Sequence, residues 1–172
     1  MAEQGTHKPL VVSSNLTLGT LTRIKRVFFL GDYVSNIPAS LLEVREHNEL
    51  GYKPLIDYQS WREDLMNYTA ELLSEKINRM QKHIETDKVF VLLTGRWILF
   101  LGEGNDAAAH VHATDMKPFQ LYNVKRGAWH SHTFNEDAKV LIVENHDTVD
   151  VNSPFVYLMP GQCQQVINVS SG

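Results

Sequence analysis

The sequence has very little of several features that define common protein classes. It holds a single cysteine, Cys163, among its 172 residues, so it forms no internal disulfide and no cysteine-rich zinc site. No run approaches the roughly 20 apolar residues that span a bilayer, and the N-terminal residues lack the basic-then-apolar pattern of a signal peptide. We therefore expect a cytoplasmic protein without membrane contact, in which Cys163 has no chemical role.

Positive charge is also scarce. The chain has 16 Lys and Arg residues against 20 Asp and Glu residues, which gives a net charge of −4 with neutral histidines. Nucleic-acid-binding surfaces usually carry a basic patch, so we expect no nucleic-acid partner. Glycine-rich phosphate loops, nucleophile elbows and H-E-x-x-H helices are missing as well, which excludes the common nucleotide-binding, serine-hydrolase and metalloprotease classes.

The sequence contains enough hydrophobic residues to form the core of one folded domain. Hydrophobic residues make up 43% of the chain and charged residues 21%, which are ordinary values for globular proteins. We divide the chain into an N-terminal extension at 1–34, a main domain at 35–160 and a polar C-terminal tail at 161–172. The extension contains two short predicted strands, at 9–13 and 24–30.

Short apolar runs separated by turn residues dominate the main domain. Residues 89–93 and 97–101 flank a glycine-containing turn, a pattern that predicts a β-hairpin. Residues 70–78 fit a short helix, or a loop followed by a strand, about equally well. Further short strands are predicted at 41–44 within an otherwise loop-like stretch (37–60), and at 119–124, 128–133, 140–143 and 155–158. Many short strands without intervening helices indicate an all-β sandwich or barrel.

Several polar side chains would converge inside such a barrel. Because side chains alternate along a strand, Arg79, Gln81 and His83 would share one face. The same rule places His130 and His132 together. A buried polar cluster costs stability unless it is hydrogen-bonded or liganded, so it indicates either a functional site or a structural hydrogen-bond network.

Two stretches resemble the conserved motifs of the cupin superfamily. Residues 81–95, QKHIETDKVFVLLTG, resemble the first motif: His83 and Gly95 match it, while Gln81 and Lys88 stand where the family has a histidine and a glutamate. The resemblance covers residues 35–158. It implies an all-β jelly-roll barrel, here with extra N-terminal strands, and a site inside the barrel mouth.

The second cupin motif is similar to residues 122–134, YNVKRGAWHSHTF. Gly127 and His130 match this motif, while Lys125 replaces a proline and Phe134 replaces an asparagine. Cupins are often dimeric, and the extension carries Phe28 and Phe29 on a strand that could pack against a partner subunit. We therefore expect a homodimer.

The resemblance also implies a metal site, which metal-binding cupins build from three histidines and one glutamate. Only His83 and His130 remain of that set, and a protonated Lys88 would repel a divalent cation. We therefore expect no metal cofactor. The alternative is a divalent metal held by His83, His130 and His132, with Glu85 or Asp87 as a carboxylate ligand.

Within the superfamily the sequence most resembles the ureidoglycolate lyase family. Lys82, His83, Lys88 and Phe90 carry this resemblance, together with the run Trp129-His130-Ser131, in which Ser131 replaces a second histidine and Lys88 replaces a glutamine. The resemblance implies cleavage of a small polar carboxylate. His130 or His83 would be the base, and Lys88 or Arg79 would bind the carboxylate.

Polar and aromatic neighbours of these residues are the candidate ligand-binding residues: Arg79, Gln81, His132, Trp129, Tyr122 and Phe90. The aromatic ones could equally be barrel core. Three functions stay open. The protein is a non-redox lyase-like enzyme acting on a small polar acid, a non-catalytic cupin that binds a sugar or small acid, or a metal-dependent isomerase or dioxygenase.

Overall fold

The structure, a computed structural model, describes residues 37–172, so the strands predicted at 9–13 and 24–30 lie outside the described residues. Contacts divide the chain into two units, Met1–Glu43 and Val44–Gly172, and every strand described here belongs to the second unit. No helix in the described range is long and apolar enough to cross a membrane.

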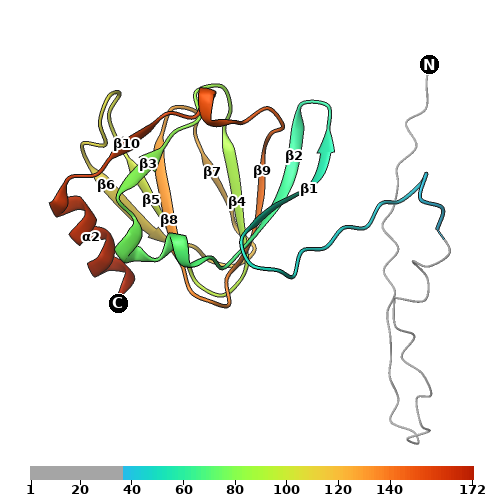
Figure 1. Ribbon diagram of the computed structural model, residues 1–172, viewed down its shortest axis with the longest axis horizontal. Helices are drawn as coiled ribbons and strands as arrows, with labels where there is room; N and C mark the ends of the chain where they lie inside the picture. The colour runs from blue at the N-terminus through green and yellow to red at the C-terminus, as the bar shows by residue number, and fades with distance from the viewer. Residues whose placement is uncertain (1–36) are drawn as a thin grey trace, which may run out of the picture. The chain divides into compact units, whose positions relative to one another are not determined.

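Residues 44–172 form two antiparallel sheets of five strands each (Figure 1). Sheet A has the order β1-β2-β9-β4-β7, and sheet B has the order β10-β3-β8-β5-β6. The strands are β1 (Tyr52–Tyr58), β2 (Trp61–Asn67), β3 (Arg79–Gln81), β4 (Lys88–Thr94), β5 (Trp97–Gly102), β6 (Val111–Asp115), β7 (Leu121–Val124), β8 (Trp129–Phe134), β9 (Lys139–Asn145) and β10 (Phe155–Tyr157).

Strands from opposite ends of the domain pair with each other in both sheets. In sheet A, β9 lies between β2 and β4, and in sheet B, β8 lies between β3 and β5. Strands β2 to β9 are thus the eight interleaved strands of a jelly roll, which is the fold that cupins share with lectin and viral capsid domains. The predicted all-β jelly-roll class is confirmed.

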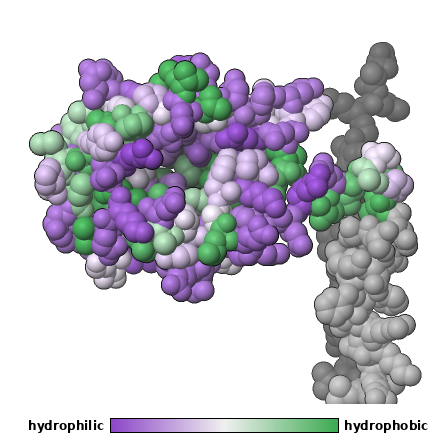
Figure 2. Space-filling model, viewed as in Figure 1, coloured by the Kyte–Doolittle hydropathy of each residue, from purple (hydrophilic) through white to green (hydrophobic). Residues whose placement is uncertain are grey.

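The inward faces of the two sheets make one core cluster, and a second cluster joins the alternate residues of sheet B to the C-terminal helix. Alternation is clearest in β9, where Val140, Ile142 and Glu144 are buried and the residues between them are partly exposed. Phe90, Trp97 and Val140 are completely buried, and burial of each such side chain contributes about 1.5–3 kcal/mol. The face visible in Figure 2 is mainly hydrophilic, with separate small hydrophobic patches, as expected for a domain whose apolar side chains are mostly inside.

The predicted hairpin at 89–101 is wrong. Strand β4 pairs with β7 and β9 in sheet A, whereas β5 pairs with β6 and β8 in sheet B, so the turn between them crosses from one sheet to the other. Both runs are apolar at nearly every position, and periodicity cannot show which strand such a run pairs with. Gly95 makes the crossing with a positive φ of 74°.

The N-terminal part of the main domain also differs from the prediction. No strand exists at 41–44, and the region read as loop contains β1. Pro54 explains the error: proline interrupts ladders, and here it lies in an edge strand, where the register shifts between Pro54 and Ile56. Residues 70–78 form two short 3-10 helices, Ala70–Leu72 and Ser74–Lys76, before β3 begins.

The C-terminal residues are not the polar tail that the sequence predicts. Pro160–Ser170 form helix α2, with proline in the first turn, where its missing N–H costs no hydrogen bond. Val166 is completely buried and packs in a cluster with Met80 and Leu158. Gln162 donates to the Ala108 carbonyl, and Gln165 donates to the Val111 carbonyl. A mostly polar helix that buries one valine leaves too weak an apolar pattern to be recognised.

Candidate functional site

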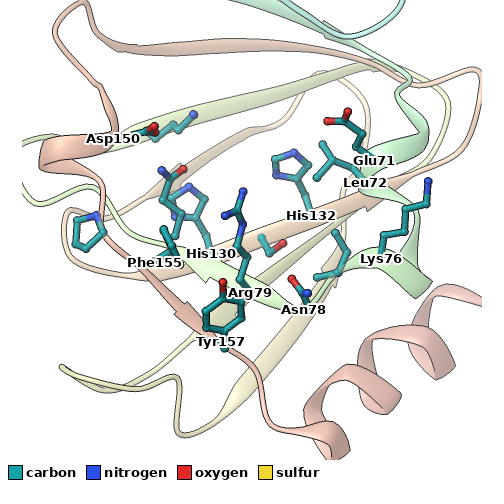
Figure 3. A pocket seen from close by; sticks show the side chains of 15 residues that line it. Glu71, Leu72, Lys76, Asn78, Arg79, His130, His132, Asp150, Phe155 and Tyr157 are labelled. Carbon is teal, nitrogen blue, oxygen red and sulfur yellow. The ribbon is translucent and has the colours of Figure 1, made fainter.

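A cavity of about 820 Å³ opens beside strands β3, β8 and β10 (Figure 3). Its walls come from four strands, from the 3-10 segment before β3 and from the segment before β10. The lining residues are Glu71, Leu72, Lys76, Ile77, Asn78, Arg79, Gln81, Lys88, His130, Ser131, His132, Asp150, Pro154, Phe155 and Tyr157. This is the volume range of small-molecule sites.

The predicted histidine cluster exists, but its members differ in access to the cavity. Gln81 lies opposite His130 across the β3–β8 ladder, and both line the cavity. His83 follows the end of β3 and is buried beside His130, with ring centroids 5.0 Å apart. Its Nδ1 lies 2.7 Å from Ser153 Oγ. His83 therefore packs against His130 in the interior and does not itself line the cavity.

Burial keeps these imidazoles uncharged. Burial, together with the positive charge of Lys88, lowers the pKa of His130 to about 3 and that of His83 to about 4. The same two causes lower the pKa of His132 well below its ordinary value. His130 Nδ1 lies 3.3 Å from the carbonyl of Ala128, to which it donates as the protonated nitrogen. Nε2 of His130 is then a free lone pair that can accept a proton.

Lys88 points into the barrel and does not pair with Glu85 or Asp87. Its Nζ lies 2.9 Å from Oε2 of the buried Glu144, and Arg62 Nε donates to Glu144 Oε1 at 3.1 Å. Burial raises the pKa of Glu144, but Lys88 and Arg62 outweigh it and hold the pKa below the ordinary value. Glu144 thus neutralises much of the charge that Lys88 could offer a ligand.

Asp64 completes this buried ionic cluster from strand β2. It is fully buried, with Oδ1 at 3.5 Å from Arg62 Nε. Burial raises its pKa to about 6, and the nearby Glu144 adds to the rise. The cluster therefore balances two cations, Lys88 and Arg62, against two carboxylates. Sequence reasoning missed Arg62, Asp64 and Glu144; the charged residue at an inward position of the apolar strand KVLIVEN was the available signal for Glu144.

Arg79 and Lys76 are cations that line the cavity without an ion pair among the described residues, and Glu71 and Asp150 are carboxylates of the same lining. Arg79 is exposed on β3. Its guanidinium carbon lies 4.9 Å from the ring centroid of Phe155, and Tyr157 is its partner across the β3–β10 ladder. Arg79 thus fits the predicted anion-binding role better than Lys88 does.

Of the remaining candidate binding residues, His132 lines the cavity, whereas Phe90, Trp129 and Tyr122 do not. Phe90 and Trp129 are buried in the core. Tyr122, on β7, accepts a hydrogen bond from the Lys117 N–H and donates to Gln120, on the surface. His132 lines the cavity, but its ring stacks on Trp97 with a centroid distance of 4.4 Å.

The side chains present do not fit a metal site. Within residues 37–172, no three His, Cys, Asp or Glu residues are grouped so that they could hold a metal ion. The carboxylates that could rescue such a site are occupied elsewhere. Asp87 binds Asn123, Lys125 and the Arg126 N–H at the surface, and Glu85 accepts a hydrogen bond from Asn152.

Comparison with known proteins gives matches in structure only. No family model and no curated sequence matches the chain. A cupin-2 domain protein from Shewanella frigidimarina is 14% identical, with a TM-score of 0.43 over 70% of this chain and 95% of the other. A cupin superfamily protein from Desulfitobacterium hafniense is 17% identical, with a TM-score of 0.42 over 63% and 87%.

A third similar structure is the nucleoside dehydratase Pac13 from Streptomyces. It is 12% identical to this chain, with a TM-score of 0.44 over 67% of this chain and 87% of the other. The chain has the jelly-roll fold found in cupins. That statement rests on the strand order of the two sheets, which gives a fold and no activity.

Proposed function

We propose that the cavity is the active site of a lyase-type enzyme that cleaves a polar 2-hydroxy carboxylate without redox chemistry. The observation that carries the proposal is the combination of a neutral His130 and an unpaired Arg79 at one cavity. A guanidinium is the side chain best shaped to bind a carboxylate through two parallel hydrogen bonds. A neutral imidazole next to it can accept the proton of a substrate hydroxyl.

In the proposed reaction one proton passes from the substrate hydroxyl to His130 and then to the leaving nitrogen. His130 Nε2 accepts the hydroxyl proton, and the electron pair of the O–H bond forms a carbonyl at the same carbon. The bond from that carbon to the leaving nitrogen breaks, and the nitrogen keeps the pair and takes the proton from the imidazolium. Ureidoglycolate would give glyoxylate and urea in this way, and it is the first substrate to test.

The low pKa of His130 has consequences for such a reaction. The imidazole is fully available as an acceptor at neutral pH, and the imidazolium that it forms is a strong acid toward the leaving nitrogen. A carboxylate bound at Arg79 adds negative charge to the cavity and raises the pKa of His130 toward its ordinary value. We expect kcat/KM, which reports the free enzyme, to show no inflection near pH 6.5.

The experiment is turnover of ureidoglycolate and related 2-hydroxy acids by the wild type and by His130→Gln. Loss of a general base typically costs 10²–10⁴-fold, so we expect kcat to fall at least about 10²-fold with the fold intact. The exposed His110, on the loop before β6, provides the control His110→Gln, which should keep full activity. A His130→Gln variant as active as the wild type would contradict the proposed base.

A second function is favoured by the cavity itself, because its volume and mixed polar and aromatic lining suit ligand binding without any proton transfer. In this alternative the protein is a non-catalytic module that binds a sugar or small acid in the cavity. It predicts that a ligand raises the melting temperature without being consumed. Turnover of ureidoglycolate or of any related 2-hydroxy acid would contradict this non-catalytic alternative.

A further inference from the structure

The cavity is larger than the small acids that the proposed chemistry needs. A volume of about 820 Å³ lies in the upper part of the range of about 300–1,000 Å³ that holds drug-sized ligands. A three-carbon acid such as ureidoglycolate would leave most of this space to water. A ligand that filled the cavity would need a substantial part in addition to its carboxylate.

The side of the cavity next to Arg79 carries two exposed aromatic rings. Phe155 is 50% exposed and Tyr157 is 66% exposed, although aromatic side chains of this size normally bury most of their surface. Both project from β10 on the same side as Arg79 and Gln81 of β3, and all four line the cavity. Figure 3 shows Tyr157, Phe155 and Arg79 next to one another.

The two rings are arranged to receive a flat group. Their centroids are 5.7 Å apart and their planes are nearly perpendicular, at 86°. A planar ring that stacks on one of them is therefore nearly perpendicular to the other, and edge-to-face contact is one of the preferred geometries of aromatic pairs. The guanidinium carbon of Arg79 lies 4.9 Å from the Phe155 ring centroid, and Arg79 forms no ion pair within residues 37–172, so its N–H groups can bind a carboxylate.

We propose that the ligand of this cavity carries a flat conjugated ring in addition to its carboxylate, so that the ring packs against Phe155 and Tyr157 while Arg79 binds the carboxylate. This inference rests on the proposed function, because it assigns a ligand class to the same cavity. Short-chain acids then bind weakly, through Arg79 alone. Ring-bearing acids bind more tightly, because they also bury the two exposed aromatic faces.

Matched probes separate the contributions of charge, planarity and size. Indole-3-carboxylate and benzoate are the flat acids, cyclohexanecarboxylate is the non-planar match of benzoate, and benzamide is its uncharged match. Glycolate and ureidoglycolate are the short acids. Titration calorimetry should give benzoate a dissociation constant at least fivefold below that of cyclohexanecarboxylate or benzamide. Indole-3-carboxylate should bind at least tenfold more tightly than glycolate.

Variants assign the effect to the named residues. Arg79→Gln and Phe155→Leu should each weaken indole-3-carboxylate at least tenfold, and Phe155→Leu should weaken indole-3-carboxylate by a larger factor than glycolate. Both side chains are exposed, so neither change removes core packing. Tyr58→Leu is the matched control, because Tyr58 is also an exposed aromatic on a strand but lies on β1 and does not line the cavity.

The outcomes distinguish this inference from the proposed function. If short acids bind and turn over while flat acids bind no better, the ring-bearing ligand is wrong and the proposed function stands. If neither class binds, both are wrong. If Phe155→Leu changes the oligomeric state in sedimentation and leaves binding of flat acids unchanged, the exposed rings are a contact between copies of the chain, and the inference is overturned.

Discussion

The imidazole ring of His132 is packed among aromatic rings, which cannot form a hydrogen bond with its nitrogens. It stacks on Trp97 and lies 5.9 Å from both Phe90 and Phe134, measured between ring centroids. Both ring nitrogens are shielded from solvent without a hydrogen-bond partner. A buried polar group left unpaired costs about 1–3 kcal/mol, so this residue lowers the stability of the fold.

The substitution His132→Phe should therefore keep or raise the free energy of unfolding, by up to about 2 kcal/mol, because it removes the unpaired nitrogens and retains the stacked ring. His47 is the control: it is also buried, but its Nε2 lies at hydrogen-bond distance, 3.0 Å, from the Gly51 carbonyl. His47→Phe should be destabilising in the same urea titration. Equal destabilisation by both changes would show that His132 makes hydrogen bonds in solution.

Individual site residues were predictable where a strand pattern fixes their direction. Alternation along β3 and β8 correctly brought Gln81 and His130 to one place. The ionic partners of Lys88 were not predictable in this way. Arg62 and Glu144 come from strands far apart in the sequence, and only the order of strands in sheet A places them beside Lys88.

The turn between β4 and β5 has a stricter requirement than an ordinary loop. Gly95 has a positive φ, and a Cβ built there would lie 2.5 Å from the backbone nitrogen of Ala138. Gly127 also has a positive φ, of 80°, but a Cβ there would meet nothing within 4 Å. Substituting Gly127 thus introduces backbone strain alone, whereas substituting Gly95 introduces both backbone strain and a steric clash.

We expect Gly127→Ala to cost about 1–2 kcal/mol, which is the strain of the left-handed conformation alone. Gly95→Ala should cost at least about 2 kcal/mol more, because the strands β4, β5 and β9 must also move apart around Ala138. Thermal or urea unfolding of both variants measures the difference. Similar losses for the two variants would mean that the crossing turn relaxes without disturbing the sheets.

The presence of the strands could be predicted from the sequence better than the strands with which each one pairs. The strands from β4 to β10 appear in the sequence as mainly apolar runs, except β6, whose residues are mostly exposed, and β8, whose sequence WHSHTF is mostly polar. The pairing of β4 was mispredicted because a run that is apolar at nearly every position carries no signal of its neighbour, although only Phe90 and Leu92 of this strand are fully buried. Helix α2 was missed because Val166 is its one buried residue.

At the scale of the whole domain, the buried titratable groups make stability depend on pH. The folded pKa values of His83 and His130 lie at about 4 and about 3, below the value of about 6.5 expected in the unfolded chain. Their contribution is present above pH 6.5 and is lost as the pH falls toward the folded values. Asp64 acts in the opposite direction: its raised pKa of about 6 adds stability as the pH falls below 6.

We expect the free energy of unfolding to fall between pH 6.5 and pH 4. At pH 4 each of the two histidines removes about 3 kcal/mol and Asp64 returns about 2 kcal/mol. Urea titrations at pH 7, 5.5 and 4 measure the slope. Asp64→Asn should make the loss steeper, whereas the exposed Asp57→Asn should not. A stability that is constant over this range would contradict the neutral, buried state of the histidines.

Strand β1 also affects how separate molecules behave toward one another. Within the described chain it is an outer strand of sheet A, and such a strand can template the addition of another chain. Pro54 supplies no N–H, the register shifts beside it, and the charged Lys53 and Asp57 are exposed along the strand. A second strand cannot form a continuous ladder there. A proline that obscures the strand in the sequence thus protects the folded protein from growing into fibres along that edge.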